Sequence, residues 1–217
     1  GRIVMQYDYD LLSTVIRQKS MEAPEQWMLN DVRGKPIRVW KTPQNQPTDP
    51  EQCFATAYDA LRRPIKSFFD DTGLPDPTQG ILFEQIIYGE SLGAAAAGSN
   101  SRGRIIQQFD GAGIATFSYD FKGNLLDSSR QLTVEYQRRV DWKRPPNPTD
   151  TYSSQTQYDA LNRAISMVSP HTGAMTANVN QPVYNEAGLL NSIDVSVRGA
   201  PSVSYVKNID YNEKGQR

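Results

Sequence analysis

The chain contains one histidine and one cysteine, residue types that often serve as a catalytic base, a nucleophile or a zinc ligand. A catalytic triad or a zinc site needs partner residues, and there is no second histidine or cysteine. His171 lies in a Pro-His-Thr-Gly segment, which is typical of a turn. Cys53 could be a nucleophile only if the fold supplied a histidine base. We therefore predict a surface turn at His171 and a small, partly buried side chain at Cys53.

Acidic residues that recur at one place in a repeated pattern are the other candidates for chemistry: Asp31, Asp59, Asp110, Asp120 and Asp159. Paired catalytic carboxylates need environments that hold their pKa values apart, and periodic acids show no such distinction. An Asp side chain can instead hydrogen-bond the backbone two residues on and begin a turn. A hydrolase on a β scaffold therefore has no nucleophile–base set, and we predict no enzyme, no metal and no cofactor.

The repeated pattern is an aromatic residue, an acid, two variable residues, a glycine, a polar residue and then an apolar-led run. It is clearest at residues 119–126, and further copies begin at Phe109, Tyr184 and Tyr211. The copy at Asn30 lacks the aromatic residue, and the copies at Tyr58 and Tyr158 lack the glycine. We predict a structural role for the following repeat residues: Asp31, Gly34, Tyr58, Asp59, Phe109, Asp110, Gly113, Tyr119, Asp120, Gly123, Tyr158, Asp159, Tyr184, Asn185, Gly188, Tyr211 and Gly215.

Each copy predicts a strand, a tight turn and a second strand. The aromatic residue favours a pleated, half-buried surface, and the glycine supplies a positive φ at little steric cost. A hairpin with a loop of roughly three to five residues follows. Asn162 fits the glycine position because asparagine tolerates the left-handed region, whereas at Arg62 we expect a different turn. One hairpin cannot bury its apolar side alone, so the copies must stack side by side.

Composition limits the partners of the 217-residue chain. The formal net charge is −1 and the pI is about 5.9, so the surface lacks the basic excess that nucleic acid or an anionic membrane attracts. No apolar run approaches the roughly 18 residues of a membrane-spanning helix, and no signal peptide is recognisable. The chain begins at Gly1 and stops inside a repeat at Arg217, so we expect a fragment of a larger protein.

The pattern resembles the YD repeat of the Rhs family, which includes bacterial Rhs proteins, the B and C components of insecticidal toxin complexes, and animal teneurins. The nearest likeness is to toxin-complex and SpvB-associated Rhs proteins. It rests on residues 119–126, on residues 100–104 ahead of Phe109, and on residues 7–12. The likeness covers nearly the full length, and six or seven copies in one chain make it far more specific than a single copy.

The resemblance implies a structural segment of a β-shell that encapsulates a C-terminal toxin or effector domain, to which any chemistry would belong. Its partners would be the remainder of its own polypeptide and other toxin-complex subunits. Its location would be secreted or at the cell surface, as part of a larger bacterial protein. Many Rhs cores also carry Asp-Pro-x-Gly motifs of an aspartyl self-cleavage region. The dipeptides at Asp49 and Asp76 lack that glycine, so the protease is not expected.

For the whole chain we predict an all-β fold of consecutive antiparallel hairpins in one curved, twisted sheet, with residues 1–217 as a single array. At most one short helix is expected, near residues 91–98, where four alanines lie between glycines. The alternation of apolar residues over 131–142 predicts a long strand. Proline-rich residues 41–52 and 144–149 predict loops, the second within the array rather than between domains.

The alternative of another class is an exposed repeat module whose tyrosine-rich face binds carbohydrate or a partner protein. Exposed tyrosines in a shallow groove would favour the binding module, and tyrosines stacked between adjacent hairpins would favour the shell. A sheet cut from a longer one also has unpaired edge strands, which recruit other chains. We therefore predict self-association through residues 2–9 or residues 202–209.

Overall fold

The computed structural model describes residues 3–42 and 50–217, and within them the chain is all β apart from short helical turns. The predicted loop at 41–52 therefore lies partly, and the start of the predicted strand at Arg2 wholly, outside the described residues. The first seven strands are β1 (Met5–Tyr9), β2 (Val15–Ser20), β3 (Glu25–Asn30), β4 (Pro36–Thr42), β5 (Gln52–Tyr58), β6 (Pro64–Asp70) and β7 (Ile81–Tyr88). The others are β8 (Ile105–Asp110), β9 (Gly113–Tyr119), β10 (Leu125–Thr133), β11 (Pro148–Tyr158), β12 (Ala164–His171), β13 (Val179–Tyr184), β14 (Leu190–Ser196) and β15 (Val203–Val206).

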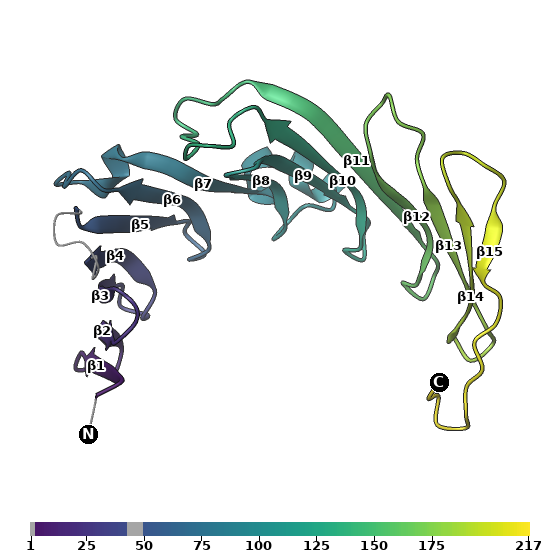
Figure 1. Cartoon of the computed structure of the whole chain (residues 1–217), viewed down its shortest axis with the longest axis horizontal. Coiled ribbons are helices and arrows are strands. Elements are labelled where there is room, and N and C mark those ends of the chain that lie inside the picture. Colours follow the sequence, from purple (N-terminus) through teal and green to yellow (C-terminus); the bar gives the residue numbers. More distant parts are fainter. Residues whose placement is uncertain (1–2, 43–49) are drawn as a thin grey trace. The chain divides into compact units, whose positions relative to one another are not determined.

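The fifteen strands of the described residues form one sheet, in which their order is the same as in the sequence (Figure 1). The paired strands are antiparallel throughout, as consecutive hairpins require. The all-β prediction of antiparallel hairpins in a single sheet is thereby confirmed. The expected short helix is also present, as α1 (Ala95–Gly98), which follows the 3-10 turn η2 (Gly89–Leu92); a second 3-10 turn is η1 (Pro77–Gln79).

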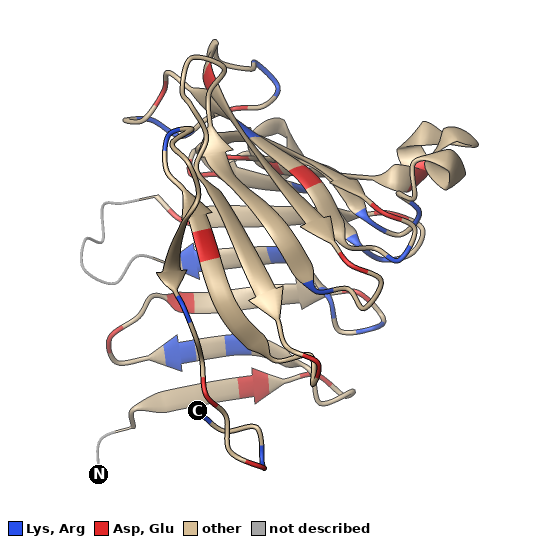
Figure 2. Ribbon diagram, turned by 90° about the vertical axis from the view of Figure 1, so that its right-hand side faces the viewer, with Lys and Arg blue, Asp and Glu red and all other residues tan. Residues whose placement is uncertain are grey.

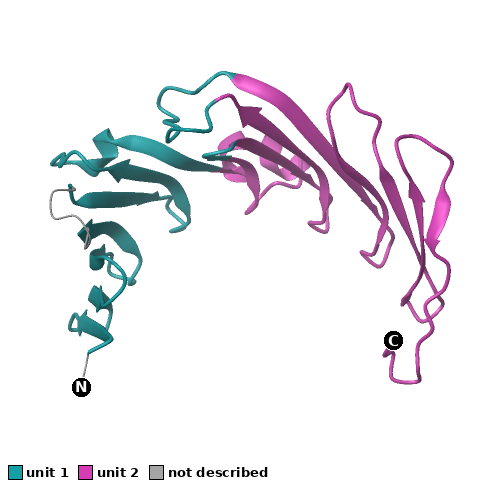
Figure 3. Ribbon diagram, viewed as in Figure 1, with its two compact units in different colours: residues 1–86, 109–112, 135–147 teal, residues 87–108, 113–134, 148–217 magenta. Residues whose placement is uncertain are grey.

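The strands and loops group into two compact units (Figure 3). Unit 1 comprises residues 1–86, 109–112 and 135–147, and unit 2 comprises residues 87–108, 113–134 and 148–217. The prediction that residues 1–217 form one repeat array as a single domain stays a prediction.

Every second connection between strands lies at the same end of the strands, because neighbouring strands are antiparallel. The repeat turns occupy that end, as the connections β1–β2, β3–β4, β5–β6, β9–β10, β11–β12 and β13–β14. The opposite end carries connections of variable length, from residues 111–112 to residues 134–147. The sequence pattern thus fixes one end of the hairpins and leaves the other free to vary.

The buried apolar residues of the core lie mostly in unit 1. They are Cys53, Ala55, Phe68, Phe69, Leu82, Val140 and Trp142, whereas unit 2 has Ala96 and Ala115 among the described residues. In unit 2, β14 is half-buried along its whole length and β11 is mostly exposed, as expected for a sheet one layer thick. Such a sheet gains little from a core, so contacts between neighbouring hairpins must contribute much of its stability.

Residues 135–147, here called the strap, form the connection from β10 to β11 but belong to unit 1. The Trp142 backbone N–H donates to the Leu82 carbonyl (2.8 Å), and the Asp141 carboxylate accepts from the Leu82 N–H (3.0 Å). The Trp142 indole N–H donates to the Asp110 carbonyl (3.2 Å), and its ring meets Phe109 edge to face with centroids 5.0 Å apart. The strap therefore supplies β7 with a local backbone partner and covers part of the unit 1 core.

The strand predicted over residues 131–142 is wrong, because β10 ends at Thr133. Beyond it the Glu135 carboxylate accepts hydrogen bonds from the N–H groups of Gln137 (2.8 Å) and Arg138 (2.9 Å), which closes a turn. Val134 and Tyr136 are 54% and 86% exposed, so their alternation with polar residues has no sheet surface to cover. The proline-rich stretch at 144–149 is divided between the strap and the start of β11.

Candidate functional site: the row of turns

The repeat turns share one geometry, which can be numbered from the Asp or Asn as position 1. In each, the position 1 N–H donates to the carbonyl of position 5, the position 4 N–H donates back to position 1, and the position 1 side chain accepts from the position 5 N–H. Among the described residues the seven position 1 residues are Asp10, Asp31, Asp59, Asp120, Asp159, Asn185 and Asn212. Both asparagine copies keep all these bonds, so the turn needs the side-chain oxygen and not its charge.

Position 4 has a positive φ in every copy, which is the reason for its glycines. Gly34, Gly123, Gly188 and Gly215 have φ values of 78°, 97°, 76° and 72°. The expectation of a different turn at Arg62 is wrong: Arg62 has φ 62°, as does Asn162. An arginine in the left-handed region costs free energy, and the Arg62 guanidinium is held there by an ion pair of 2.7 Å with Asp31.

Sequence reasoning missed the turn at residues 10–14, which has the same bonds with Ser13 at position 4 and φ 62°. Its aromatic residue is Tyr9 and its acid is Asp10, two residues beyond the Tyr7-Asp8 pair that first matches the pattern. Two overlapping aromatic–acid pairs and no glycine hid the register.

The copy at Phe109 is of another kind and lies at the opposite end of the strands. Asp110 accepts from the Ala112 N–H (2.8 Å), which closes a tight connection over residues 111–112. Gly113, with φ 142°, begins β9, and a Cβ there would overlap the Gln131 carbonyl oxygen. Phe109, Asp110 and Gly113 therefore serve the strap and the β9–β10 contact rather than the row of turns.

Four of the tyrosines that precede a turn reach the preceding hairpin. The hydroxyl of Tyr58 donates to the Pro36 carbonyl (2.8 Å), and that of Tyr119 donates to the Ile105 carbonyl (2.8 Å). The same bond recurs from Tyr184 to Ala164 (3.0 Å) and from Tyr211 to Leu190 (2.7 Å). For Tyr58, Tyr184 and Tyr211 the acceptor is position 6 of the preceding repeat turn. Ile105 is position 6 in the same sense when residues 100–104 are counted from Asn100 as position 1.

Asn30 replaces the tyrosine in the one copy that lacks an aromatic residue. Its amide donates to the Val15 carbonyl (3.0 Å), which is again position 6 of the preceding turn. The bond between hairpins is therefore kept by a side chain of different type. Tyr158 ends β11 and is half-buried, opposite Ala164.

Cations at position 5 complete the link between turns. The Lys35 ammonium, the Arg104 guanidinium and the Arg163 guanidinium lie 5.7, 5.1 and 4.6 Å from the ring centroids of Tyr58, Tyr119 and Tyr184. Such contacts contribute about 0.5–1 kcal/mol each where exposed. Arg104 comes from residues 100–104, which make an irregular turn with Gly103 at φ 74°.

Side chains at position 5 also touch position 4 of the next turn. Lys35 donates to the Arg62 carbonyl, Arg104 donates to the Gly123 carbonyl (3.1 Å), and the Asn124 amide donates to the Asn162 side chain (3.0 Å). We call the set of contacts from position 5 and position 6 to the next turn the inter-turn clamp. The inter-turn clamp repeats inside each unit. Sheet hydrogen bonds join neighbouring hairpins along their strands, and the clamp joins them at their turns as well.

Four of the turn acids, Asp31, Asp59, Asp120 and Asp159, have lowered pKa values. For Asp31 and Asp159 the largest cause is the hydrogen bond from the position 5 N–H. For Asp59 and Asp120 burial raises the pKa, and the hydrogen bonds that each carboxylate accepts outweigh it. The ionised form is therefore the one that the turns stabilise.

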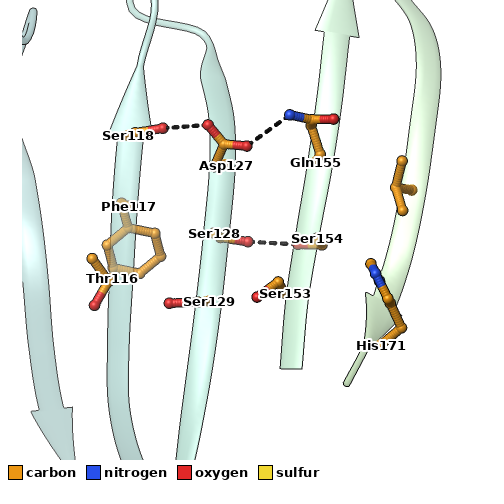
Figure 4. A pocket seen from close by; sticks show the side chains of 11 residues that line it. Thr116, Phe117, Ser118, Asp127, Ser128, Ser129, Ser153, Ser154, Gln155 and His171 are labelled. Carbon is orange, nitrogen blue, oxygen red and sulfur yellow. Dashed lines mark hydrogen bonds between the residues drawn. The ribbon is translucent and has the colours of Figure 1, made fainter. Parts of the chain in front are cut away.

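A polar hollow of about 500 Å³ lies over β9–β12 in unit 2 (Figure 4). Asp127 accepts from the Ser118 hydroxyl (2.8 Å) and the Gln155 amide (3.0 Å), and the hydroxyls of Ser128 and Ser154 are 2.7 Å apart. These side chains come from neighbouring strands that the register places opposite one another.

His171 belongs to this hollow, since it is the last residue of β12 and lies opposite Ser153. The predicted surface turn begins one residue later than His171, because β12 ends at His171 and the Met175 N–H donates to the Thr172 carbonyl (3.0 Å). The strand register brings Ser153, His171 and Asp127 into one hollow, although they are far apart in the sequence. However, His171 Nδ1 contacts the Ser169 carbonyl (3.1 Å), and Asp127 binds Ser118 and Gln155. These bonds do not form a Ser-His-Asp relay.

Cys53 is buried in β5 of unit 1, opposite Trp40 and Asp70, and burial raises the pKa of its thiol. Among residues 3–42 and 50–217 no group of three His, Cys, Asp or Glu side chains is arranged to hold a metal ion. No helix in these ranges is long and apolar enough to cross a membrane. Acidic and basic residues are interspersed over strands and turns (Figure 2).

The chain is similar to solved toxin-complex structures. With a Photorhabdus luminescens Tc holotoxin pore it shares 20% identity over 98% of its length, with a TM-score of 0.79. With TcdB2-TccC3 it shares 20% identity over 99% of its length, with a TM-score of 0.80. With TcdB2-TccC3 without its hypervariable C-terminal region the values are 20%, 98% and 0.78. The expected likeness to toxin-complex proteins is confirmed for the fold.

The chain spans about a tenth of the length of each of these solved chains. No family model matches the sequence, and no curated protein matches it.

Proposed function

We propose that this chain is a wall segment of an Rhs-type β-shell, within a larger secreted bacterial toxin-complex protein, and that the shell encloses a C-terminal toxin or effector domain. The observation that carries the proposal is the inter-turn clamp. A wall must hold hairpin to hairpin along its length without a core behind it. The tyrosine hydroxyls reach the preceding hairpin at Tyr58, Tyr119, Tyr184 and Tyr211, which is the arrangement that favours a shell over a binding face.

The fold likeness adds support, because it extends over 98–99% of the chain and places it alongside about a tenth of much longer chains. On this proposal the segment has no catalytic task, and its partners are the rest of its own polypeptide and other toxin-complex subunits. The repeat residues then serve geometry: position 1 closes each turn, position 4 permits it, and the tyrosine and position 5 join it to its neighbour.

Limited proteolysis of the full-length natural protein tests the proposal. The C-terminal domain should survive intact while exposed linkers are cut. A paired change that opens the clamp, Arg104→Ala with Tyr119→Ala, should make that domain susceptible at the same protease dose. Tyr136→Ala, on an 86% exposed side chain, is the matched control and should leave protection unchanged. Equal digestion of the C-terminal domain in all three proteins would reject enclosure.

The second candidate, a module that binds carbohydrate, draws on the polar hollow over β9–β12. Its hydroxyl, amide and carboxylate groups are of the types that bind sugars. Those of Ser118, Asp127 and Gln155 already bind one another. A sugar would have to replace these bonds, so the shell is the better supported function. Glycan-array binding that Gln155→Ala abolishes would favour the second candidate.

A further inference from the structure

Unit 1 has a small apolar hollow that the row of turns does not use. Phe54, Phe69, Phe83 and Val140 line it together with Gly111 and Arg139, and its volume is about 220 Å³. The Phe54 ring meets Phe69 and Phe83 edge to face, with centroids 5.1 and 6.2 Å apart. All the lining residues belong to unit 1, two of them through the strap.

Two cations stand over the aromatic walls. The Arg139 guanidinium lies 3.7 Å from the Phe69 ring centroid, and the Lys41 ammonium lies 4.8 Å from that of Phe54. Arg139 comes from the strap and Lys41 from β4, so two different elements place positive charge at an apolar surface.

Arg139 keeps donors for a further anion. Stacking on Phe69 uses the face of the guanidinium and leaves its N–H groups pointing outward in its plane. Its ion pair with Asp71 is long, at 3.5 Å, and both side chains are about half exposed, at 53% and 44%. Exposed pairs of this kind contribute little and exchange readily, so an incoming carboxylate can compete with Asp71.

The volume sets the class of ligand. Sites for drug-sized molecules are about 300–1,000 Å³, so this hollow suits one large side chain rather than a whole small molecule. The aromatic walls suit an apolar side chain, and the two cations suit the carboxylate of a neighbouring residue in the same segment.

We propose that this hollow is a docking site for an extended polypeptide segment in which an aromatic residue is next to Asp or Glu. The aromatic side chain enters between Phe54, Phe69 and Phe83, and the neighbouring carboxylate binds Arg139. The proposal goes beyond the shell function and does not depend on it, because it concerns a segment that the protein binds and not where the protein is located.

Methyl NMR of the full chain tests the proposal with a short acetylated peptide containing Phe-Asp-Glu as the probe. Val140 lines the hollow, so its methyl resonances should shift and saturate on titration. Peptides containing Ala-Asp-Glu or Phe-Lys-Lys separate the roles of ring and charge. Each should bind at least tenfold more weakly than the Phe-Asp-Glu peptide.

Matched variants separate the hollow from general charge. Arg139→Glu should weaken peptide binding at least tenfold, whereas Arg138→Glu makes the same change of charge at a residue that does not line the hollow and should leave binding within twofold. Gly111→Leu should also weaken binding, because Gly111 lines the hollow with open space around it and no positive φ. Gly173→Leu is its control at another glycine with open surroundings.

Equal binding of the three peptides, or equal loss with Arg138→Glu and Arg139→Glu, would overturn the proposal. So would light scattering showing that a second copy of the chain occupies the hollow, detected as self-association that Gly111→Leu abolishes. Thermal melts of every variant accompany the titrations, and an unfolded Arg139→Glu protein would be replaced by Arg139→Gln, which removes the charge alone.

Discussion

Tyr119 combines three contributions in one side chain: a half-buried ring, a hydroxyl bonded to Ile105 and a cation stacked on its face. Tyr119→Phe removes only the hydroxyl and should cost about 1 kcal/mol of unfolding free energy. Tyr119→Ala also removes the ring and should cost about 3 kcal/mol. Urea denaturation measures both. Tyr136→Ala changes an exposed ring, so its unfolding free energy should stay within about 0.5 kcal/mol of that of the unchanged chain. Equal urea midpoints for the unchanged chain and all three variants would show that Tyr119 does not contribute to the inter-turn clamp.

Gly123 and Gly34 occupy the same turn position but differ in their surroundings. A Cβ at Gly34 would meet Thr14 at 3.6 Å, which is ordinary contact, whereas a Cβ at Gly123 would overlap the Arg104 guanidinium. Gly34→Ala should therefore cost about 1 kcal/mol for its left-handed backbone. Gly123→Ala should cost more than Gly34→Ala, because the Arg104 guanidinium would have to move away from the Gly123 carbonyl and the Tyr119 ring.

Thermal denaturation of the two glycine variants and of Arg104→Ala with Gly123→Ala checks the assignment. Removing the guanidinium should bring the cost of Gly123→Ala down to that of Gly34→Ala. A cost that the Arg104 change does not lower would mean that backbone strain alone acts at Gly123.

The turns as elements should make stability depend on pH. Asp31, Asp59, Asp120 and Asp159 have pKa values below the ordinary value of 3.8 in the folded chain. A depressed folded pKa gives stability that is complete above the unfolded pKa and is lost as the pH falls through the folded one. The melting temperature should therefore hold from pH 7 to about 5 and drop below about pH 4.

Asparagine provides the control for the loss of stability at low pH, because Asn185 and Asn212 make the same turn without a charge. Asp120→Asn with Asp159→Asn should fold at pH 7 and lose less melting temperature between pH 5 and pH 3 than the unchanged chain. An equal loss of melting temperature between pH 5 and pH 3 in the variant and the unchanged chain would assign the pH dependence to other carboxylates.

At the scale of elements, the sequence predicts individual hairpins well, but it predicts poorly which contacts they make with neighbouring hairpins. The pattern of aromatic, acid and glycine is local, so it identifies the turns at residues 119–124 and 184–189 directly. Arg62 takes the same turn because Asp31, in the preceding hairpin, holds its guanidinium. The alternation over residues 131–142 predicts a strand, but β10 ends at Thr133. Alternation indicates a strand only where a neighbouring strand is there to pair with it, and the local sequence does not show whether one is.

The contacts of the inter-turn clamp are likewise hard to predict from the sequence. Tyrosine before the turn is visible in the sequence, but its bond partner lies 14–22 residues earlier, on another hairpin. Asn30 makes that bond with a different side chain, so residue type alone would not have found it. The polar hollow likewise depends on strand register, which places Ser153 opposite His171.

For the molecule as a whole, the two ends of the sheet order are β1 and β15. Both strands expose apolar side chains: Tyr7 and Tyr9 are 42% and 57% exposed, and Val203 and Tyr205 are 61% and 66% exposed. Unpaired, apolar edges recruit further strands. We expect the isolated chain to self-associate with rising concentration, as measured by multi-angle light scattering.

Val203→Lys with Tyr205→Lys places two charges on β15 and should reduce that association. Lysine at Tyr136, in the strap, adds charge away from either edge and should not reduce it. A chain that remains monomeric at high concentration, or that associates equally in the β15 variant, would contradict an edge-strand interface at β15.

The division of the connections between the two ends of the strands has a consequence for how such a chain can change. The end that carries the inter-turn clamp tolerates few insertions, because each turn must present position 4 and position 5 to its neighbours. The opposite end accepts connections as short as residues 111–112 and as long as residues 134–147. New sequence, such as an epitope tag or a grafted loop after Gly173, can be added there while the sheet keeps its register. One end of the hairpins is thereby held constant, and the other is open to diversification.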